Sequence, residues 1–173
     1  IGRMETRSDI LVVGGGLSGP ALALALARAG LTVTLVDALS PGMRADPGFD
    51  GRAYALALAS RRLLSALGLW DGLAERAQPI LEIKVSDGRP GEGAAPWMMH
   101  FDHAEIEEGP MGHMLEDRYL RRALLDAMAA EPGIRHVAPA EVTAQETGPA
   151  RGAVTLSYRT RHTSRLRVGS DGR

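Results

Sequence analysis

The sequence predicts an α/β fold with a parallel sheet, an antiparallel β-meander and a further β-rich segment. Three observations support this prediction. A βαβ pattern occupies residues 9–37, a helical pattern followed by a strand-like run occupies residues 117–137, and short strand-like runs separated by polar turns fill residues 142–168. With 173 residues, 45% of them hydrophobic, the chain is long enough for one domain with a full core.

The first βαβ unit consists of two apolar runs with a helix-forming segment between them. Asp9–Val13 is a short β-branched run of the kind found in buried parallel strands, and Leu31–Asp37 is a second one. Between them, Ser18–Ala29 is rich in Ala and Leu, and Gly30 stands where a helix C-cap is expected. Two strands joined by a helix in this way should be parallel.

The middle of the chain departs from simple α/β alternation. Residues 38–51 are dense in Gly, Pro and Asp, which predicts an irregular loop, and Tyr54–Leu67 has leucines near helical spacing. Ile80–Asp87 alternates apolar and polar residues, which predicts a half-buried antiparallel strand, and Trp97–Ile106 is the expected returning strand. We therefore expect an antiparallel hairpin between two α/β segments.

The last part of the chain returns to the α/β pattern. Asp117–Ala130 has apolar side chains at helical spacing on one side, and Gly133 is expected to end the helix. Ile134–Val137 is predicted to be a third parallel strand, and residues 142–168 are predicted to form the antiparallel meander.

Three glycines follow the first strand with the spacing G-x-G-x-x-G. Gly14 permits a tight turn, Gly16 lets a pyrophosphate approach the backbone, and Gly19 permits close contact between helix and strand. Leu17 and Ser18 complete the predicted cofactor-binding turn, where amide hydrogens and the helix dipole face the anion. The alternative is a glycine-rich turn that only packs a helix on a sheet.

Asp37 ends the second predicted strand, 18 residues after Gly19. Its carboxylate is predicted to accept hydrogen bonds from both ribose hydroxyls of an adenosine and to repel a 2′-phosphate. The whole pattern predicts a Rossmann-type dinucleotide-binding domain. It disfavours NADP as the resident dinucleotide and leaves FAD and NAD open.

Further segments carry a resemblance that covers essentially all of Ser8–Arg173. Besides the glycine turn, they are "DGRAYALALASRRLLSALGLW" (Asp50–Trp70), "GHMLEDRYLRRALLDAM" (Gly112–Met128) and "VGSDGR" (Val168–Arg173). In this order they resemble the FAD-dependent aromatic-ring hydroxylases, and within that group the ubiquinone-biosynthesis monooxygenases that hydroxylate polyprenyl phenols. The resemblance implies a Rossmann-type FAD-binding domain of residues 4–78 and 111–173, and a β-hairpin, residues 79–110, that is part of a β-rich substrate domain.

The resemblance also implies site residues outside the glycine turn. Arg52 would approach the flavin at the start of a helix, and Arg118 would reach the ribityl and pyrophosphate portion of FAD. Asp171 and Gly172 resemble an Asp-Gly motif that contacts FAD and is associated with NAD(P)H binding. The alternatives are solvated or ion-paired surface arginines and an ordinary Asp-Gly turn.

The implied activity is hydroxylation of a small phenolic substrate by O2, with FAD as cofactor and NAD(P)H as transient reductant. No catalytic side chain and no oligomeric state are assigned. Two alternatives stay open: another FAD or NAD oxidoreductase, such as a dehydrogenase or reductase, and a non-catalytic module of a quinone-biosynthesis complex. The resemblance further implies an N-terminal piece of a longer hydroxylase, inactive by itself, and residues 1–3 are interpreted as carried over from cloning.

Composition argues against several classes of function. A net charge of −1 gives no overall attraction to nucleic acid, and 4% aromatic residues without a basic stripe argue against a base-stacking platform. The absence of Cys excludes disulfides and thiolate chemistry. The longest apolar stretch is shorter than the roughly 20 residues of a membrane-spanning helix. We expect a soluble protein in the cytoplasm, or one at the periphery of the inner membrane and associated with it or with a quinone-biosynthesis complex.

The segment "HFDHAE" contains four side chains of metal-binding type. On a strand, alternation sends His100 and Asp102 to one face and His103 and Glu105 to the other. Neither face then has three ligands, so we predict no metal site.

Overall fold

The computed structural model describes residues 5–106, 109–149 and 151–172. The described chain folds into two compact units, of which one contains residues up to Gly48 and from Arg118 onward and the other is Phe49–Asp117. The predicted domain boundaries after residues 78 and 110 fall inside the second unit, and the assignment of domains by function stays a prediction. Residues 1–3, interpreted as carried over from cloning, lie outside the described residues.

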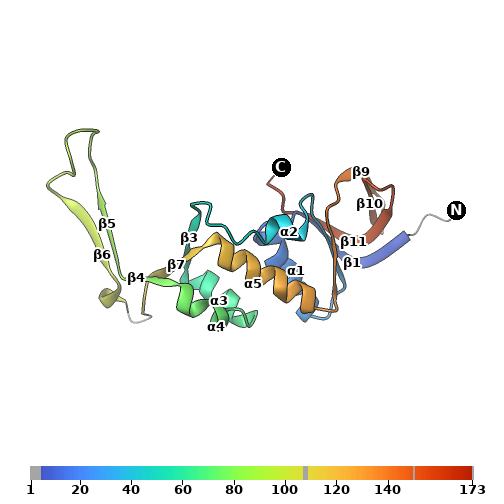
Figure 1. Ribbon diagram of the computed structural model, residues 1–173, viewed down its shortest axis with the longest axis horizontal. Coiled ribbons are helices and arrows are strands. Elements are labelled where there is room, and N and C mark those ends of the chain that lie inside the picture. Colours follow the sequence, from blue (N-terminus) through green and yellow to red (C-terminus); the bar gives the residue numbers. More distant parts are fainter. Residues whose placement is uncertain (1–4, 107–108, 150, 173) are drawn as a thin grey trace. The chain divides into compact units, whose positions relative to one another are not determined.

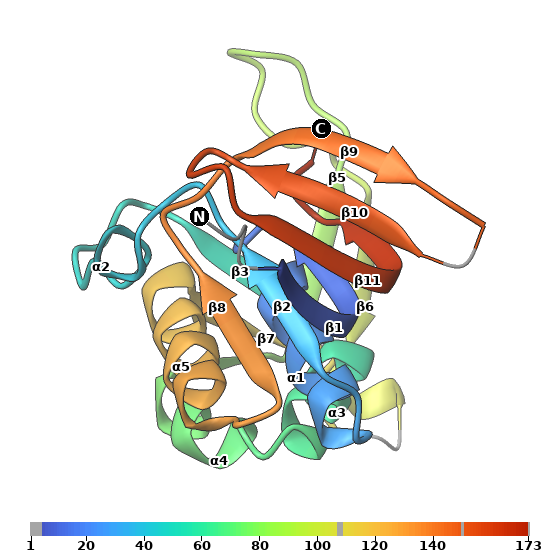
Figure 2. The same ribbon diagram turned by 90° about the vertical axis from the view of Figure 1, so that its right-hand side faces the viewer.

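In the described part of the chain, a six-stranded mixed sheet forms the centre of the first unit. Its strands are β1 (Glu5–Val13), β2 (Val33–Val36), β8 (Ile134–Val137), β9 (Val142–Thr147), β10 (Gly152–Leu156) and β11 (Arg161–Gly169). The order is β8-β2-β1-β11-β10-β9 (Figure 2). β1 pairs in parallel with β2 and β11, and β2 with β8, whereas β10 pairs antiparallel with β9 and β11. The predicted parallel sheet and meander are confirmed, and β11 belongs to both.

The helices of the first unit follow from the pattern of small and apolar residues. α1 (Ser18–Arg28) packs against β1, β2 and β8, and Gly30, with a φ of +89°, follows its C-cap. All four residues of β2 are buried, as expected for a parallel strand covered on both faces. α2 (Pro41–Arg44) is a short helix inside the predicted loop, and α5 (Asp117–Ala130) has the predicted bounds. Among the described residues, no helix is both long and apolar enough to cross a membrane.

The second unit contains a small antiparallel sheet of β3 (Ala53–Ala57), β7 (Gly112–Glu116) and β4 (Gln78–Ile80). After β3 come α3 (Leu58–Ala66), α4 (Trp70–Leu73) and a 3₁₀ turn, η1 (Ala74–Arg76). The helix predicted over Tyr54–Leu67 is therefore wrong in its first part. "AYALA" consists largely of helix formers, but its backbone pairs with β7, and this pairing overrides local propensity.

A β-hairpin of β5 (Glu82–Ser86) and β6 (Met98–Asp102) completes the second unit and forms a long two-stranded arm (Figure 1). The single strand predicted over Ile80–Asp87 is divided at Leu81, because the residues before it pair with β7 and those after it pair with β6. The returning strand ends at Asp102 and continues as a 3₁₀ turn, η2 (His103–Glu105).

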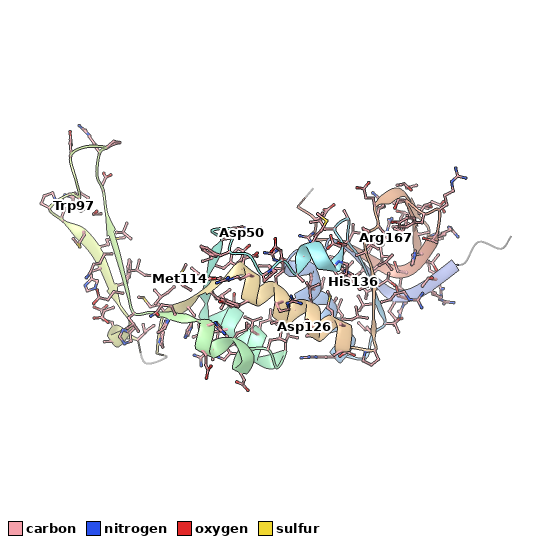
Figure 3. The ribbon with its side chains drawn as sticks, in the orientation of Figure 1. Asp50, Trp97, Met114, Asp126, His136 and Arg167 are labelled. Carbon is pink, nitrogen blue, oxygen red and sulfur yellow. The ribbon has the colours of Figure 1, made fainter. Side chains whose placement is uncertain are left out.

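The expectation of a half-buried strand in this hairpin is wrong. Ile83 and Val85 face Phe101 and Met99 across the hairpin, yet Ile83 is 41% exposed and Phe101 46%. Trp97, just before β6, is also exposed (Figure 3). Alternation gives the hairpin one apolar face, but no described residue buries it.

Candidate nucleotide-binding site

Two glycines of the turn between β1 and α1 face backbone atoms. Gly14 has a φ of +117°, and a Cβ on this residue would lie 2.6 Å from the carbonyl carbon of Ser170. A Cβ on Gly19 would overlap the carbonyl oxygen of Gly14. Because backbone cannot move aside as a flexible side chain can, both positions require glycine. Gly14 thus permits the turn, and Gly19 permits the close approach of α1, while their part in cofactor binding stays a prediction.

Gly16 differs from both because its free side opens onto space. Apart from its neighbours in the chain, no atom of the described residues would lie within 4 Å of a Cβ on Gly16. Backbone exposed in this way at the start of a helix can approach a phosphate closely. The placement of a pyrophosphate at Gly16 stays a prediction.

Gly15 is a residue of the turn that the sequence analysis did not single out. A Cβ on Gly15 would overlap the carboxylate of Asp37, so the glycine lets this side chain fold back against the turn. The spacing G-x-G treats the intervening residue as free. The sequence signal that could have identified Gly15 is the run of three consecutive glycines, which has one glycine more than the spacing needs.

Asp37 follows β2, and its side chain is only 2% exposed. Arg44, at the end of α2, donates from Nε to Oδ2 at 2.7 Å and from Nη2 to Oδ1 at 2.8 Å, and the Leu39 N–H donates to Oδ1 at 3.3 Å. Burial acts to raise the pKa of the Asp37 carboxyl, but the hydrogen bonds from Arg44 and Leu39 outweigh it and hold the pKa below its ordinary value. Asp37 is therefore ionised at neutral pH.

A cleft of about 490 Å³ lies beside the turn in the first unit. Its lining includes four predicted site residues: Gly14, Gly16, Asp37 and Asp171. Arg44 also lines it, although the sequence analysis did not single out this residue. Arg44 belongs to no sequence motif, and a single arginine in a loop rich in Gly and Pro cannot be told from a surface residue by sequence alone. The cleft falls within the roughly 300–1,000 Å³ typical of small-molecule sites.

Ser170 joins the end of β11 to the turn after β1. Its N–H donates to the Val13 carbonyl oxygen at 2.7 Å, and its hydroxyl donates to the carbonyl oxygens of Val13 and Gly14, both at 3.1 Å. Asp171 thereby lies at the cleft, and Gly172 beyond it has a φ of +76°. Ser170 was missed because a serine before Asp-Gly is an ordinary turn residue.

Leu17, Ser18 and Arg118 are further predicted site residues of the first unit, and they are not part of the cleft lining. Leu17 is the N-cap residue of α1 and Ser18 its first residue, so both act through the backbone of the helix N-terminus. Arg118 donates from Nη1 to the Pro47 carbonyl oxygen at 3.2 Å, and its guanidinium lies 4.8 Å from the centre of the Tyr119 ring. Its role toward the ribityl and pyrophosphate portion stays a prediction.

Arg52 lies in the second unit, directly before β3. The expectation that it stands at the start of a helix is wrong, because α3 begins only at Leu58. The guanidinium forms an ion pair with Asp50 and lies 3.4 Å from Oδ2 of Asp117, whose Oδ1 accepts a hydrogen bond from the Tyr54 hydroxyl at 3.0 Å. Two carboxylates thus orient Arg52, although its side chain is 57% exposed.

The hairpin brings three side chains of metal-binding type together. Ligand atoms of Glu82, His100 and Asp102 lie within 4.8 Å of one another. The expectation that neither face offers three ligands is wrong, because Glu82 lies opposite Asp102 on the paired strand. Lys84 Nζ, however, lies 2.6 Å from Glu82 Oε2 and already neutralises that carboxylate, so we assign no metal to this exposed group.

The sequence profile of the FAD binding domain family matches residues 7–173. The chain belongs to this family. The cofactor predicted from the sequence, FAD, is confirmed as that of the family, and the open cradle at Gly16 beside the Asp37 cleft fits a dinucleotide. The assignment of individual residues to parts of FAD stays a prediction.

Two curated relatives of the chain are named as hydroxylases. Ubiquinone hydroxylase UbiL of Rhodospirillum rubrum is 42% identical over 172 residues, which cover 99% of this chain and 39% of UbiL. The 3-demethoxyubiquinol 3-hydroxylase of Escherichia coli is 31% identical, over 95% of this chain and 41% of the enzyme. The predicted kinship with ubiquinone-biosynthesis hydroxylases is confirmed. The chain spans about two fifths of the length of these relatives.

Solved structures show the same fold at lower identity. A PqsL variant of Pseudomonas aeruginosa superposes with a TM-score of 0.77 and 23% identity, over 96% of this chain and 43% of that chain. The p-nitrophenol 4-monooxygenase PnpA of Pseudomonas putida superposes with a TM-score of 0.76 and 19% identity, over 98% of this chain and 42% of that chain. The predicted α/β fold of an FAD-binding domain is confirmed by these similarities.

Proposed function

We propose that the whole protein is an FAD-dependent monooxygenase that hydroxylates a polyprenyl phenol of ubiquinone biosynthesis. The overall reaction converts a ring C–H bond to C–OH with one atom of O2, while the other atom leaves as water and NAD(P)H is oxidised. The names of the related hydroxylases support the substrate class. FAD, when bound, supplies the redox chemistry, and the protein supplies binding, orientation and exclusion of water.

The contrast among the glycines of the turn is the observation that carries the FAD-binding part of this proposal. Gly14, Gly15 and Gly19 are closed in by protein atoms, whereas Gly16 faces the cleft. A turn that only packed a helix on the sheet would have no need of glycine at residue 16. The helix N-terminus suits a pyrophosphate, and the Asp37 carboxylate suits a ribose hydroxyl.

Each predicted site residue then has one task. The amides of Leu17 and Ser18 bind the pyrophosphate, and Arg118 contacts the ribityl–pyrophosphate portion with donors that match phosphate oxygens. Asp171 and Gly172 form one wall of the nucleotide site. Arg52, oriented by its two carboxylate partners, contacts the flavin.

We also propose that the FAD-binding domain comprises residues 4–78 and 111–173 and that residues 79–110 belong to a substrate domain. The exposed apolar face of the β5–β6 hairpin supports this assignment. An apolar face of this kind suits a site for a polyprenyl tail or packing against further strands. Peripheral association with a membrane or a quinone-biosynthesis complex belongs to the same proposal.

Absorbance spectra of the purified intact protein, before and after addition of FAD, test the cofactor. We expect a yellow protein, and we expect Gly16→Ala to lower FAD affinity by about tenfold or more, since the methyl group enters the pyrophosphate position. Gly72→Ala is the matched control, because Gly72 also has open space around it but lies in the other unit. Equal FAD affinity in both variants would contradict the proposed site.

Turnover tests the activity separately. We expect a polyprenyl phenol to stimulate NAD(P)H oxidation in the presence of O2 and to yield a hydroxylated ring, detected by mass spectrometry. A colourless protein that binds NAD would instead indicate a dehydrogenase. A yellow protein that supports its pathway without turning over any phenol would indicate a non-catalytic module.

A further inference from the structure

We propose that Arg44 is a positioning residue for the adenosine subsite, which it serves by holding the Asp37 carboxylate in one orientation toward the ribose. The inference rests on the proposed FAD-dependent function and names a residue that neither the glycine spacing nor the Asp-Gly motif includes. Arg44 lines the same cleft as Asp37 and binds both of its carboxylate oxygens. A guanidinium matches a carboxylate in this two-point geometry, which fixes orientation as well as distance.

The hydrogen bonds from Arg44 and Leu39 determine how many lone-pair sites of the Asp37 carboxylate are left for a ligand. A carboxylate has about four lone-pair sites. Among the described residues, Arg44 Nε fills one site on Oδ2, and Arg44 Nη2 and the Leu39 N–H fill two on Oδ1. One site, on Oδ2, is left for the cleft. With Arg44 in place, Asp37 therefore accepts from one ribose hydroxyl directly, rather than from both as the sequence predicts.

The charge of Asp37 also depends on Arg44. The carboxylate is almost completely buried, and burial alone would raise its pKa. Among the described residues, His136 on β8 (Figure 3) is a second basic group that faces it, and burial lowers the pKa of this imidazole, so it carries little charge at neutral pH. Glu141 and Asp171, which also line the cleft, cannot compensate a buried anion. Arg44 is thus the cation that keeps Asp37 ionised.

The sequence around Arg44 explains why the side chain is held there. Ser40 caps α2 by accepting a hydrogen bond from the Met43 N–H at 3.3 Å, and Pro41 occupies the first turn, where no amide hydrogen is needed. The Arg44 N–H donates to the Ser40 carbonyl oxygen at 3.0 Å. Arg44 is seven residues after Asp37 in sequence, and this short capped helix holds its side chain against the Asp37 carboxylate, with only 23% of that side chain exposed.

Titration of the intact protein with FAD between pH 5.5 and 8.5 tests the inference. We expect Arg44→Gln to weaken FAD binding roughly tenfold at pH 8. This is the effect expected when the charge-assisted hydrogen bond between the ribose hydroxyl and the Asp37 carboxylate is lost. The loss should grow on acidification, because Asp37 without Arg44 protonates at a higher pH, whereas the wild-type affinity stays flat. Arg44→Lys should recover part of the FAD affinity, and this affinity should change little with pH because the positive charge is retained. This variant also tests the inference if the Gln variant fails to fold.

An FAD analogue without the 2′- and 3′-hydroxyls of its adenosine separates positioning from general structure. It should bind the wild type more weakly than FAD does, and Arg44→Gln should cause little further loss. Arg161→Gln is the matched control: this arginine pairs with Glu146 at 2.7 Å but lies outside the cleft, so FAD affinity should be unchanged.

Three outcomes would overturn the inference. Unchanged FAD affinity in both Arg44 variants would show that Asp37 needs no positioning. Tighter binding in Arg44→Gln would show that Arg44 competes with the ribose. An equal loss with FAD and with the analogue would reduce Arg44 to a structural residue. In each case the wild type still binds FAD, whereas a wild type that binds none refutes the proposed function itself.

Discussion

The turn after β1 and the β5–β6 hairpin are both short segments with clear sequence patterns, but they differ in how their contacts are completed. In the turn, Gly14 and Gly19 meet backbone atoms and Asp37 is buried against Gly15. In the hairpin, alternation produces an apolar face that includes Ile83, and this face stays exposed. A local pattern determines which side chains share a face, whereas burial requires a partner segment that the pattern does not contain.

Gly19→Ala should show the largest difference between these two regions. The methyl group would overlap the Gly14 carbonyl oxygen, and only a shift of the backbone, either of α1 or of the turn, can relieve this contact. We expect the free energy of unfolding, measured in urea, to fall by about 3 kcal/mol. A loss below the error of the measurement would show that the turn is not rigid.

Gly15→Ala should cost less, because the obstacle is a side chain. The new methyl group would displace the Asp37 carboxylate and weaken its pair with Arg44, and because it would also lie 2.7 Å from the Asp37 Cβ, the backbone at Asp37 must shift slightly. We expect a loss of about 1–2 kcal/mol in urea unfolding, together with weaker FAD binding. A destabilisation as large as that of Gly19→Ala would contradict this distinction between backbone and side-chain obstacles.

Acidification should separate the carboxylate of the turn from one on the hairpin. The pKa of Asp37 is lower in the folded protein than in the unfolded chain, so its contribution to stability is complete above about pH 5 and is lost as the pH falls through the folded-state pKa. The stability of the wild type relative to Asp37→Asn should therefore shrink between pH 6 and pH 3 in urea titrations.

Glu82→Gln is the hairpin counterpart of this experiment. Hydrogen bonding and charge from Lys84 lower the pKa of Glu82 as well, but the pair is exposed and screened by solvent. We expect the pH profile of Glu82→Gln to follow that of the wild type. A Glu82 effect equal to that of Asp37 would mean that the hairpin pair is less exposed than its structure indicates.

Phe101→Ser should have the smallest effect. Phe101 is large and apolar, but 46% of its surface is already exposed. We expect a change within about 0.5 kcal/mol in urea unfolding of the 173-residue chain. A loss above 2 kcal/mol would show that the apolar face is covered in solution.

The sequence alone could predict the first βαβ unit because its determinants are close together. Gly14, Gly19 and Gly30 each act on backbone geometry within or beside that unit, and the apolar runs identify buried parallel strands. α5 was predictable for the same reason, since its apolar stripe and the Gly133 that follows its end at Ala130 are local signals.

Contacts between distant segments explain what could not be predicted. Ala53–Ala57 is a strand because β7 pairs with it, and nothing in "AYALA" indicates that partner. Gly15, Arg44 and Ser170 became site residues only when β2, α2 and β11 placed other groups against the turn. Glu82 joined His100 and Asp102 by cross-strand pairing, which alternation along one strand cannot show.

The link from Ser170 to Val13 connects residues 157 positions apart and has a consequence for the order of events during synthesis. At typical translation rates, the glycine turn leaves the ribosome on the order of ten seconds before Ser170 is made. A nascent chain with β1, α1 and β2 alone lacks one wall of the cleft. The proposed FAD site is therefore complete only after β11 and the Ser170–Asp171 segment that follows it have been made, so we expect FAD to bind late in synthesis.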